Sequence, residues 1–366
     1  MAAAKHSDAE ILAAVERFGK QGAADHLGVK VRGLFGRLQR INARGKPFDP
    51  PAGFNASAVS TLHDADGNVK LQWVKSKQGE HSPEEWARIV KDAFADTPRV
   101  AKIAAPKQTT DKLLTVYPMG DPHIGMFSHR AETGADFDLK IAEQNLTEAV
   151  RRLIAVSPDT DEALICNVGD FYHSDTQDNI TARSGHHLDV DTRWSKILRV
   201  GVRTMRACIE FALAKHKRVR VINEIGNHDD HTSQMLTLAL ELLYEKNPRV
   251  SFDSSPAKFH YHVFGQNLFG VTHGDTVKPE ALPLLMASDK PAEWGASKFR
   301  YWLTGHIHTR RVFEQGECLV ESFRTLAARD AWTASMGYRS GRDMYAITYH
   351  KDLGEVERHR IDVAAL

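Results

Sequence analysis

Cysteine is scarce in this chain of 366 residues, and long apolar runs are absent. The three cysteines, Cys166, Cys208 and Cys318, are odd in number and far apart, which argues against a disulfide framework and against a cysteine-based zinc site. No apolar run approaches the roughly 18 residues that a membrane-spanning helix needs. The first residues also lack the apolar centre of a secretory signal. We therefore expect a cytoplasmic protein with no membrane partner.

Two common catalytic signatures are missing as well. There is no glycine-rich phosphate loop and no serine in a nucleophile-elbow pattern, so the parts of a kinase or a triad hydrolase are lacking. The charges nearly balance, with 48 Lys+Arg against 47 Asp+Glu, and 42% of the residues are hydrophobic. This is the composition of a globular protein, and the length allows one large domain plus a smaller one. The residue type in unusual supply is histidine, with 19 copies.

Residues 1–45 carry the pattern of three short helices. Ser7 and Glu10 have the capping-box spacing that opens a helix, and glycines at positions 19 and 28 interrupt the helical pattern. From Lys30 to Ile41, apolar residues recur at helical spacing with basic residues between them. This pattern indicates a helix-turn-helix-like domain whose last helix would meet DNA phosphates through Lys30, Arg32, Arg37 and Arg40. The alternative is a small helical cap packed on an enzyme domain.

The rest of the chain divides into a connector and a catalytic domain. Residues 46–112 form the connector, with a short strand predicted at Leu71–Lys75 and a capped helix start at Ser82. From residue 113 to 366, strands alternate with helices, which is the pattern of an α/β domain. The predicted strands are 113–119, 163–168, 219–225, 268–272 and 301–304, and the predicted helices are 137–156, 193–217 and 233–246.

Each of these five strands ends on a cluster of residues that metals favour. In chain order the clusters are Asp121-Pro122-His123, Gly169-Asp170-Phe171-Tyr172-His173, Gly226-Asn227-His228-Asp229, His273-Gly274-Asp275 and Gly305-His306-Ile307-His308. Because the carboxyl ends of the strands face one crevice in an open α/β sheet, clusters scattered along the chain can meet at one site. Glycines precede three of the clusters and permit sharp turns where a strand gives way to a ligand loop.

The residue types in the clusters fit a pair of divalent cations. They supply oxygen and imidazole ligands and no thiolate, from Asp121, His123, Asp170, Asn227, His273, His306 and His308. Such a mixed set suits manganese, iron or zinc better than calcium, which prefers oxygen ligands alone. The spacing of two residues within the first and the last cluster points both side chains of an extended segment to one face.

The ordered motifs Asp-x-His, Gly-Asp-x-x-His, Gly-Asn-His-Asp, His and Gly-His-x-His, over about residues 115–310, resemble the calcineurin-like metallophosphoesterase superfamily. The resemblance implies an α/β fold, a four-layer αββα sandwich of two sheets flanked by helices. It implies one metal held by Asp121, His123 and His308, and a second held by Asn227, His273 and His306, with Asp170 bridging the two. It also implies that His228 is the catalytic histidine and that Asp229 orients it.

His173 departs from the pattern of many members, which carry Asp or Asn at this position. Gly-Asp-x-x-His looks like the branch of double-strand-break repair nucleases, in which the extra histidine lies at the active site. Phage and prophage metallophosphoesterases look similar in joining N-terminal helices to such a domain, and a phage protein would work in the cytoplasm of a bacterial host. Residues 183–220, with 10 Lys+Arg and 3 Asp+Glu, are either a track for a polyanion or a solvated outer helix.

The motifs therefore predict a dinuclear metal-dependent phosphodiester hydrolase that uses a metal-bridging hydroxide, favoured as a DNA nuclease of exo- or endonucleolytic action. Two divalent ions are expected, with Mn²⁺ favoured and Zn²⁺, Fe²⁺ or Ni²⁺ as alternatives. One rival function keeps the enzyme and changes its substrate to small nucleotides or phosphomonoesters. The other is a DNA-binding protein with an inactive phosphoesterase domain. The residues leave open a homo-oligomer and a partner ATPase.

Overall fold

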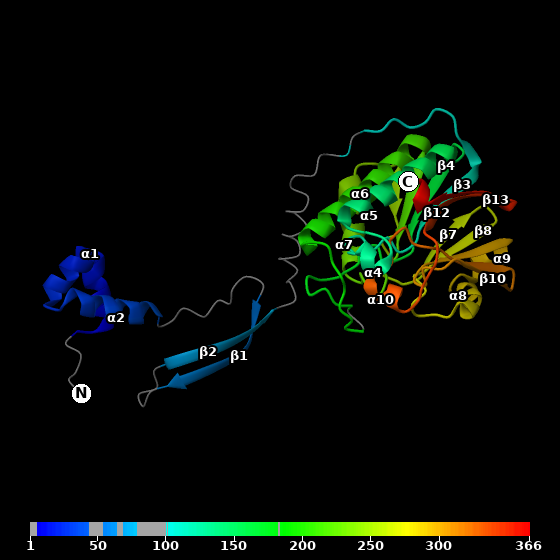
Figure 1. The fold of residues 1–366 in the computed structure, drawn as a ribbon. Helices are drawn as coiled ribbons and strands as arrows, with labels where there is room; N and C mark the ends of the chain where they lie inside the picture. The colour runs from blue at the N-terminus through cyan, green and yellow to red at the C-terminus, as the bar shows by residue number, and fades with distance from the viewer. Residues whose placement is uncertain (1–5, 44–53, 64–68, 79–99, 101, 182–183) are drawn as a thin grey trace. The chain divides into compact units, whose positions relative to one another are not determined.

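The computed structural model describes residues 6–43, 54–63, 69–78, 100, 102–181 and 184–366. The chain divides into two units, Met1–Ile89 and Val90–Leu366. Figure 1 shows the elements of each unit. The domain boundaries expected after residues 45 and 112 stay predictions.

The N-terminal unit begins with α1 (Asp8–Leu27) and α2 (Val31–Ala43). The predicted capping box forms, because the Ser7 hydroxyl accepts from the backbone N–H of Glu10 while the Glu10 carboxylate accepts from that of Ser7. Gly19, with φ 67° and ψ 173°, breaks α1 into two helical segments, and Gly28 ends the helix in the left-handed conformation, with φ 61° and ψ 35°. The three predicted helices are thus present. Their small core contains Ile11, Ala14, Ala23, Ala24, Leu34 and Leu38.

A two-stranded antiparallel sheet follows, formed by β1 (Phe54–His63) and β2 (Val69–Gln78). The predicted strand at Leu71–Lys75 lies within β2. Its partner β1 was not predicted, because residues 56–62 show no regular alternation of apolar and polar side chains, and the pairing shifts register between Ala56 and Ala58. The predicted helix start at Ser82 lies outside the described residues.

The larger unit contains a six-stranded sheet in the order β13-β12-β3-β4-β5-β6. The strands are β3 (Thr110–Met119), β4 (Thr160–Asn167), β5 (Arg218–Asn223), β6 (Val250–Phe252), β12 (Asp343–His350) and β13 (Gly354–Asp362). β3, β4, β5 and β6 are parallel, and β12 and β13 are antiparallel to their neighbours. The carboxyl ends of β3, β4 and β5 therefore lie side by side at one edge of this sheet.

The second sheet has five strands in the order β10-β11-β9-β8-β7. They are β7 (His260–Phe264), β8 (Asn267–Val271), β9 (Phe299–Thr304), β10 (Arg311–Gln315) and β11 (Cys318–Ser322). β8, β9 and β11 are parallel, whereas β7 and β10 are antiparallel edge strands. The carboxyl ends of β8 and β9 are thus neighbours as well.

Helices cover the outer faces of both sheets. On the six-stranded sheet lie α5 (Leu139–Val156), α6 (Trp194–Lys215) and α7 (Thr232–Tyr244). On the five-stranded sheet lies α8 (Leu282–Asp289), followed by α9 (Pro291–Ala296). The remaining elements are α4 (Arg130–Thr133), η1 (Pro279–Ala281), α10 (Ala331–Ser335) and η2 (Val363–Ala365). The predicted four-layer αββα sandwich is therefore confirmed.

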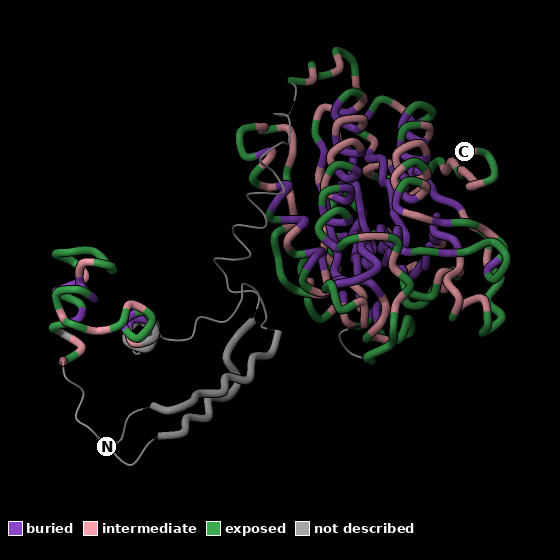
Figure 2. Tube along the Cα trace, turned by 60° about the vertical axis from the view of Figure 1, so that its left-hand side comes forward, coloured by how far each residue is buried: buried purple, intermediate pink, exposed green. Residues whose placement is uncertain are grey.

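Apolar side chains fill the space between the layers. The core between the two sheets joins residues of β3 and β4, such as Val116 and Leu164, to residues of β8 and β9, such as Phe269 and Leu303. Figure 2 shows the strands as buried segments between more exposed helices. Under α8 the fully buried Trp302 donates its indole N–H to the carbonyl of Leu282 at 2.9 Å. Removal of this apolar area from water is the main force that holds the layers together.

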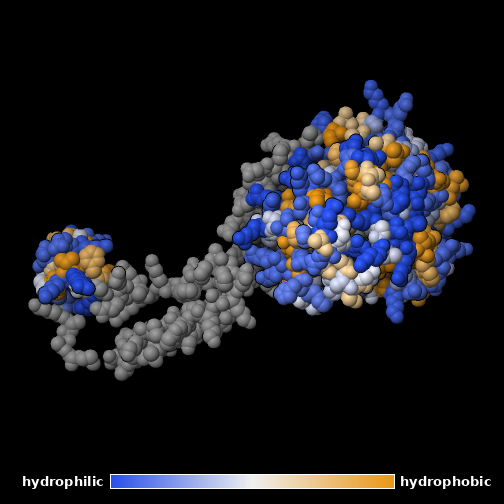
Figure 3. Space-filling model, in the orientation of Figure 1, coloured by the Kyte–Doolittle hydropathy of each residue, from blue (hydrophilic) through white to orange (hydrophobic). Residues whose placement is uncertain are grey.

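The surface of the larger unit is mixed in character. On the face that Figure 3 shows, hydrophobic residues are scattered among hydrophilic ones. Within the described part of the chain, no helix has both the length and the apolar character that a membrane span requires.

Candidate metal centre

The five predicted clusters lie at the carboxyl ends of β3, β4, β5, β8 and β9. Three of these strands are adjacent in one sheet and two are adjacent in the other. Because the sheets pack face to face, the two groups of strand ends can share one site. Side-chain contacts between the clusters show that they do meet.

Backbone conformation sets these cluster residues apart from the rest of the chain. Among the described residues, seven that are not glycine have a positive φ, and five of the seven are predicted metal ligands. The five are Asp121 (43°), His123 (45°), Asp170 (51°), His306 (67°) and His308 (49°). Left-handed backbone costs free energy for a residue with a side chain, and it persists where the surrounding structure enforces it, often at functional sites.

Glycines allow the ligand loops to approach one another closely. Gly169 has a φ of 100°, and a Cβ atom there would also collide with the ring of His273. Gly226 and Gly305 have no such backbone requirement, but a Cβ atom would meet the carboxylates of Asp170 and Asp121, respectively. The sequence predicted sharp turns at all three glycines. At Gly226 and Gly305, glycine is required because a Cβ atom would collide with the neighbouring carboxylate. The backbone angles there do not themselves require glycine.

Asp121, His123 and His308 form the first group of potential ligands. One nitrogen or oxygen atom of each lies within 4.8 Å of the others. The Nε2 atoms of His123 and His308 are 3.1 Å apart, and His308 Nε2 lies 3.4 Å from an oxygen of Asp121. Asp121 is held in place because its carboxylate accepts from the backbone N–H of His306 at 3.0 Å. This group matches the first predicted metal position.

Asp170, His273 and His306 form the second group, within the same distance limit of 4.8 Å. Nε2 of His273 lies 3.2 Å from Asp170 and 3.1 Å from the side-chain oxygen of Asn227. Nδ1 of His273 is 2.9 Å from the carbonyl of Val168. Donation to that carbonyl would leave Nε2 to face the other ligands, an arrangement common among metal-binding histidines. The group shares His273 and His306 with the second predicted metal position and contains Asp170, the predicted bridge.

The donor atoms fit a pair of divalent cations. The Nε2 atoms of His123 and His308, 3.1 Å apart, can share a proton or can both direct a lone pair at one cation. Asp121, Asp170 and His273 are fully buried or nearly so, whereas His306 is exposed. The buried residues are therefore shielded from solvent, whereas the side of the site that carries His306 is open to it. The three cysteines are buried and none belongs to these groups.

Burial and mutual repulsion govern the protonation of the ligand groups. Burial, together with the nearby His228 and His308, holds the pKa of His123 well below its usual range. Burial raises the pKa of Asp170, but the positive field of His273 and His228 more than offsets this and holds it well below its usual range. Both residues are thus in the unprotonated form that binds a cation.

His228 lies beside the ligands but is held by a different loop. Its Nδ1 is 2.9 Å from the carbonyl of His173, and its backbone N–H donates to Asp170 at 2.9 Å. Its ring stacks on that of His173, with centroids 5.2 Å apart. Nδ1 of His173 in turn lies 3.2 Å from Nδ1 of His123. These three histidines form a third group of potential ligand atoms next to the first metal position.

Asp229 acts on the loop that carries His228. Its carboxylate accepts from the backbone N–H groups of Gly226 at 2.9 Å and Tyr172 at 3.0 Å, and from the hydroxyl of Ser233. Burial raises the pKa of Asp229 to about 7, and the charge of Asp170 acts in the same direction. The contact with the His228 ring comes from the carbonyl of His173, so Asp229 acts on the backbone of the loop and not on the ring itself.

Two supporting residues were not singled out from the sequence. Asp175 is buried and accepts from the backbone N–H groups of His231 and Thr232 at 3.0 and 2.8 Å, which ties the second cluster to the third. Thr325 donates its hydroxyl to the carbonyl of Asp121 at 2.6 Å. The position of Asp175 just beyond Gly-Asp-x-x-His is a local signal for the first. No local signal identifies Thr325, which lies 204 residues from its partner.

The predicted DNA-binding residues lie in or next to α2, away from these clusters in sequence. Lys30 and Arg32 are exposed. Arg37 forms an ion pair with Asp8 of α1, with 2.9 Å between nitrogen and oxygen. Arg40 belongs to α2, and its side chain lies outside the described part. In α6 of the larger unit, Arg203 pairs with Glu143 of α5 at 2.6 Å, so the basic stretch is partly neutralised.

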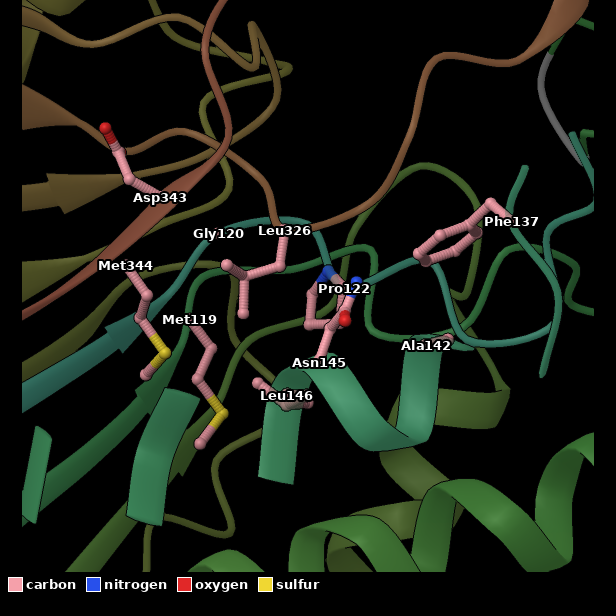
Figure 4. Close-up of a pocket in the computed structure, with 10 residues that line it drawn as sticks. All are labelled: Met119, Gly120, Pro122, Phe137, Ala142, Asn145, Leu146, Leu326, Asp343 and Met344. Carbon is pink, nitrogen blue, oxygen red and sulfur yellow. The ribbon is translucent and has the colours of Figure 1, made fainter. Parts of the chain in front are cut away.

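The small cavity in Figure 4 is separate from the predicted ligands. Its volume is about 10 Å³, and its mostly apolar lining comes from the ends of β3 and β12, from α5 and from Leu326. It includes both chain neighbours of Asp121 but none of the seven predicted ligands. A cavity of this size holds one water molecule at most. This cavity is therefore too small to hold a phosphoester.

No protein-family model and no curated protein matches this chain. Among solved structures, it is similar to an uncharacterized protein described as a predicted phosphoesterase from Streptococcus pneumoniae, with 12% identity, a TM-score of 0.29, and 68% of this chain and 98% of that chain covered. It is also similar to Vps29 complexed with zinc from Entamoeba histolytica, with 15% identity, a TM-score of 0.29, and coverage of 68% and 99%.

A third similar structure is an archaeal phosphodiesterase, with 15% identity, a TM-score of 0.34, and coverage of 68% of this chain and 99% of that chain. Likenesses this low do not establish an activity, because one fold supports many chemistries. The function has to rest on the geometry of the site.

Proposed function

We propose that this protein is a dinuclear metal-dependent phosphodiester hydrolase of the calcineurin-like superfamily, with DNA as the favoured substrate and Mn²⁺ as the favoured metal. The observation that carries the proposal is the meeting of oxygen and imidazole ligands from five strand ends in two adjoining groups. The left-handed backbone at five of these residues supports it, since such strain is retained where a site requires it.

The predicted ligands form two sets, one for each cation, with one bridging residue. Asp121, His123 and His308 would hold one cation. Asn227, His273 and His306 would hold the other, with Asp170 between the two groups. Bound there, a pair of divalent ions would supply an activated water and positive charge for the phosphate oxygens.

His228 is the residue that we assign to proton transfer. With Nδ1 donating to the carbonyl of His173, Nε2 is left to face the substrate, and in the imidazolium form it would donate its proton to the leaving oxygen or steady the charged phosphate. The side chain is partly exposed, so a substrate at the rim can reach it. The stacked ring of His173 fixes its orientation.

DNA as the substrate rests on three further observations. Lys30 and Arg32 are exposed at the start of α2, where they can meet phosphates. Arg193, Lys196 and Arg199 are exposed along the start of α6. The ring of His173 lies beside those of His123 and His228, and the resemblance to the repair nucleases implies a histidine at the active site. Each of these features favours a polyanion over a small phosphoester.

Metal content and turnover of two variants test the hydrolase. We expect Asp170→Ala to lose bound metal and activity together. His228→Ala should keep its metal and lose about 10²- to 10⁴-fold in kcat, as is typical when an acid–base group is removed. Asp352→Ala, at an exposed carboxylate on the turn after β12, is the matched control and should change neither property. Full activity in both site variants would refute the assignment.

The substrate is tested by assaying the manganese-loaded protein on single-stranded DNA, on double-stranded DNA and on bis-p-nitrophenyl phosphate. Cleavage of DNA is expected. Hydrolysis of the chromogenic ester without cleavage of any DNA would favour the rival substrate, a small nucleotide or a phosphomonoester. No hydrolysis of either kind, with any divalent metal, would favour the inactive DNA-binding protein.

A further inference from the structure

Two large aromatic side chains lie exposed on the segment after the last ligand cluster. Trp332 is 56% exposed and Tyr338 is 50% exposed, and their ring centroids are 6.0 Å apart with a tilt of 38°. An aromatic ring left in water forgoes the stabilisation that burial would give it.

The segment is fastened to the first metal position at both of its ends. At its start, the hydroxyl of Thr325 donates to the carbonyl of Asp121 at 2.6 Å. At its end, the hydroxyl of Ser340 lies 2.5 Å from that of Thr309, the residue after His308. The two exposed rings therefore lie on an arc that joins two ligand loops of the same metal position.

A third exposed aromatic residue lies on a loop that contacts this segment. Phe127, just beyond the first cluster, is 43% exposed. Its neighbour Ser128 donates to the carbonyl of Arg329 at 2.7 Å, and α4 packs against α10, as Figure 1 shows. We call Phe127, Trp332 and Tyr338 the aromatic rim.

Hydrogen bonds hold the segment in place without a ligand. Asp330 caps α10 by accepting from the backbone N–H of Thr333 at 2.7 Å. The backbone N–H of Tyr338 donates to the carbonyl of Thr333 at 3.1 Å, which closes the turn after the helix. The backbone that carries the rings is thus already ordered, so binding costs less entropy there.

The charge of the segment suits a polyanion. Residues 324–342 contain four arginines and one aspartate. Arg324 faces inward and pairs with Asp343 at 2.7 Å. Arg339 is exposed and donates to the carbonyls of Ala334 and Tyr338, and no carboxylate of the described residues lies within ion-pair distance of it. Exposed rings beside a free positive charge are the combination that binds single-stranded nucleic acid.

We propose that the aromatic rim stacks on unpaired bases of a single-stranded nucleic acid while one of its phosphodiesters lies at the metal centre. The faces of paired bases are covered inside a duplex, so an exposed ring can reach only a base outside the helix. The rim thereby selects single strands, or the frayed ends of duplexes, as the substrate. This inference rests on the proposed phosphodiesterase function and specifies its substrate class.

The test compares an oligodeoxynucleotide with an abasic strand of the same length and phosphate number. The measurement is the ratio of kcat/KM for the base-bearing strand to that for the abasic strand, with manganese-loaded full-length protein. Trp332→Ala should lower this ratio roughly 5- to 150-fold, the range expected when one base–aromatic stack is lost. Trp332→Phe keeps an aromatic face and should retain most of it. Tyr338→Ala is the second variant and should also lower the ratio.

Leu353→Ala is the matched control, because Leu353 is exposed and lies on the turn between β12 and β13. It should leave the ratio unchanged. An equal ratio in wild type, Trp332→Ala and Tyr338→Ala would refute base stacking by the aromatic rim. Cleavage of both strands by the wild type would then leave the proposed phosphodiesterase function standing. If the wild type cleaves neither strand but hydrolyses bis-p-nitrophenyl phosphate, the nucleic-acid substrate and the rim are both overturned.

Discussion

His216 is a buried histidine whose neutral form the fold requires. It ends α6, and its ring is fully buried against β3 and β4. Its Nδ1 lies 2.7 Å from the hydroxyl of Thr160, which itself donates to the carbonyl of Glu162, so Nδ1 carries the proton. Its Nε2 then accepts from the hydroxyl of Tyr117 at 2.9 Å. A second proton on the ring, at Nε2, would place an N–H donor against the O–H donor of Tyr117.

The cost of protonating this ring follows from its pKa. Burial lowers the pKa of His216 from its ordinary value of 6.5 to about 4. Between these two pH values the unfolded chain binds a proton that the folded chain does not, so the free energy of unfolding falls as the pH falls. Across this pH range the free energy of unfolding falls by about 3 kcal/mol in total, at roughly 1.4 kcal/mol for each unit of difference in pKa. The contribution is fully present above pH 6.5 and is lost on the way to pH 4.

The measurement is the urea dependence of tryptophan fluorescence from pH 7.5 to 4, with a chelator present so that metal release does not contribute. His216→Gln removes the titrating ring and keeps an amide at the position of Nε2. We expect the variant to be less stable than wild type at pH 7.5 and to lose about 3 kcal/mol less on acidification. His187→Gln, at an exposed loop histidine, is the control and should follow the wild-type profile. Parallel profiles for wild type and His216→Gln would refute the reasoning.

Three further predictions concern the metal centre and the N-terminal helices. Mn²⁺ at about 100 times its Kd should stabilise the wild type by about 2.7 kcal/mol, a rise of several degrees in Tm, and Asp170→Asn should abolish most of that rise in a thermal scan. Gly226→Ala should weaken metal binding about 10- to 100-fold by calorimetry, because the new methyl group meets Asp170, whereas Gly295→Ala, with no atom within 4 Å, should bind normally. Lys30→Ala combined with Arg32→Ala should weaken duplex DNA binding and reduce the salt dependence of log K by about 2, and an unchanged slope would remove these residues from the interface.

Local patterns were sufficient to predict most elements of the fold. Ser7 and Glu10 gave the first helix boundary, because a capping box involves neighbouring residues only. Leu113–Met119 lies within β3, and 193–217 contains α6, because a hydrophobic period shows in any window of a dozen residues. The strand β1 was not predicted, because its apolar residues do not alternate regularly and its pairing with β2 shifts register.

The sequence by itself determined which residues could bind a metal and at which strand ends they lie. Their types and spacing are local properties, and the parallel order of an α/β sheet places such ends on one side. The roles of the ligands stay predictions for the metal-binding experiments.

Only the tertiary structure decided how the clusters meet. Asp121 and His308 touch across 187 positions of the chain, and their left-handed backbone is imposed by the loops packed around them. The carbonyl of His173, rather than Asp229, contacts the His228 ring. Trp332 and Tyr338 lie in solvent, where a sequence pattern cannot distinguish an exposed ring from a buried one. Contacts between distant segments depend on how whole layers pack. Because many core residues together determine that packing, no short stretch of sequence predicts these contacts.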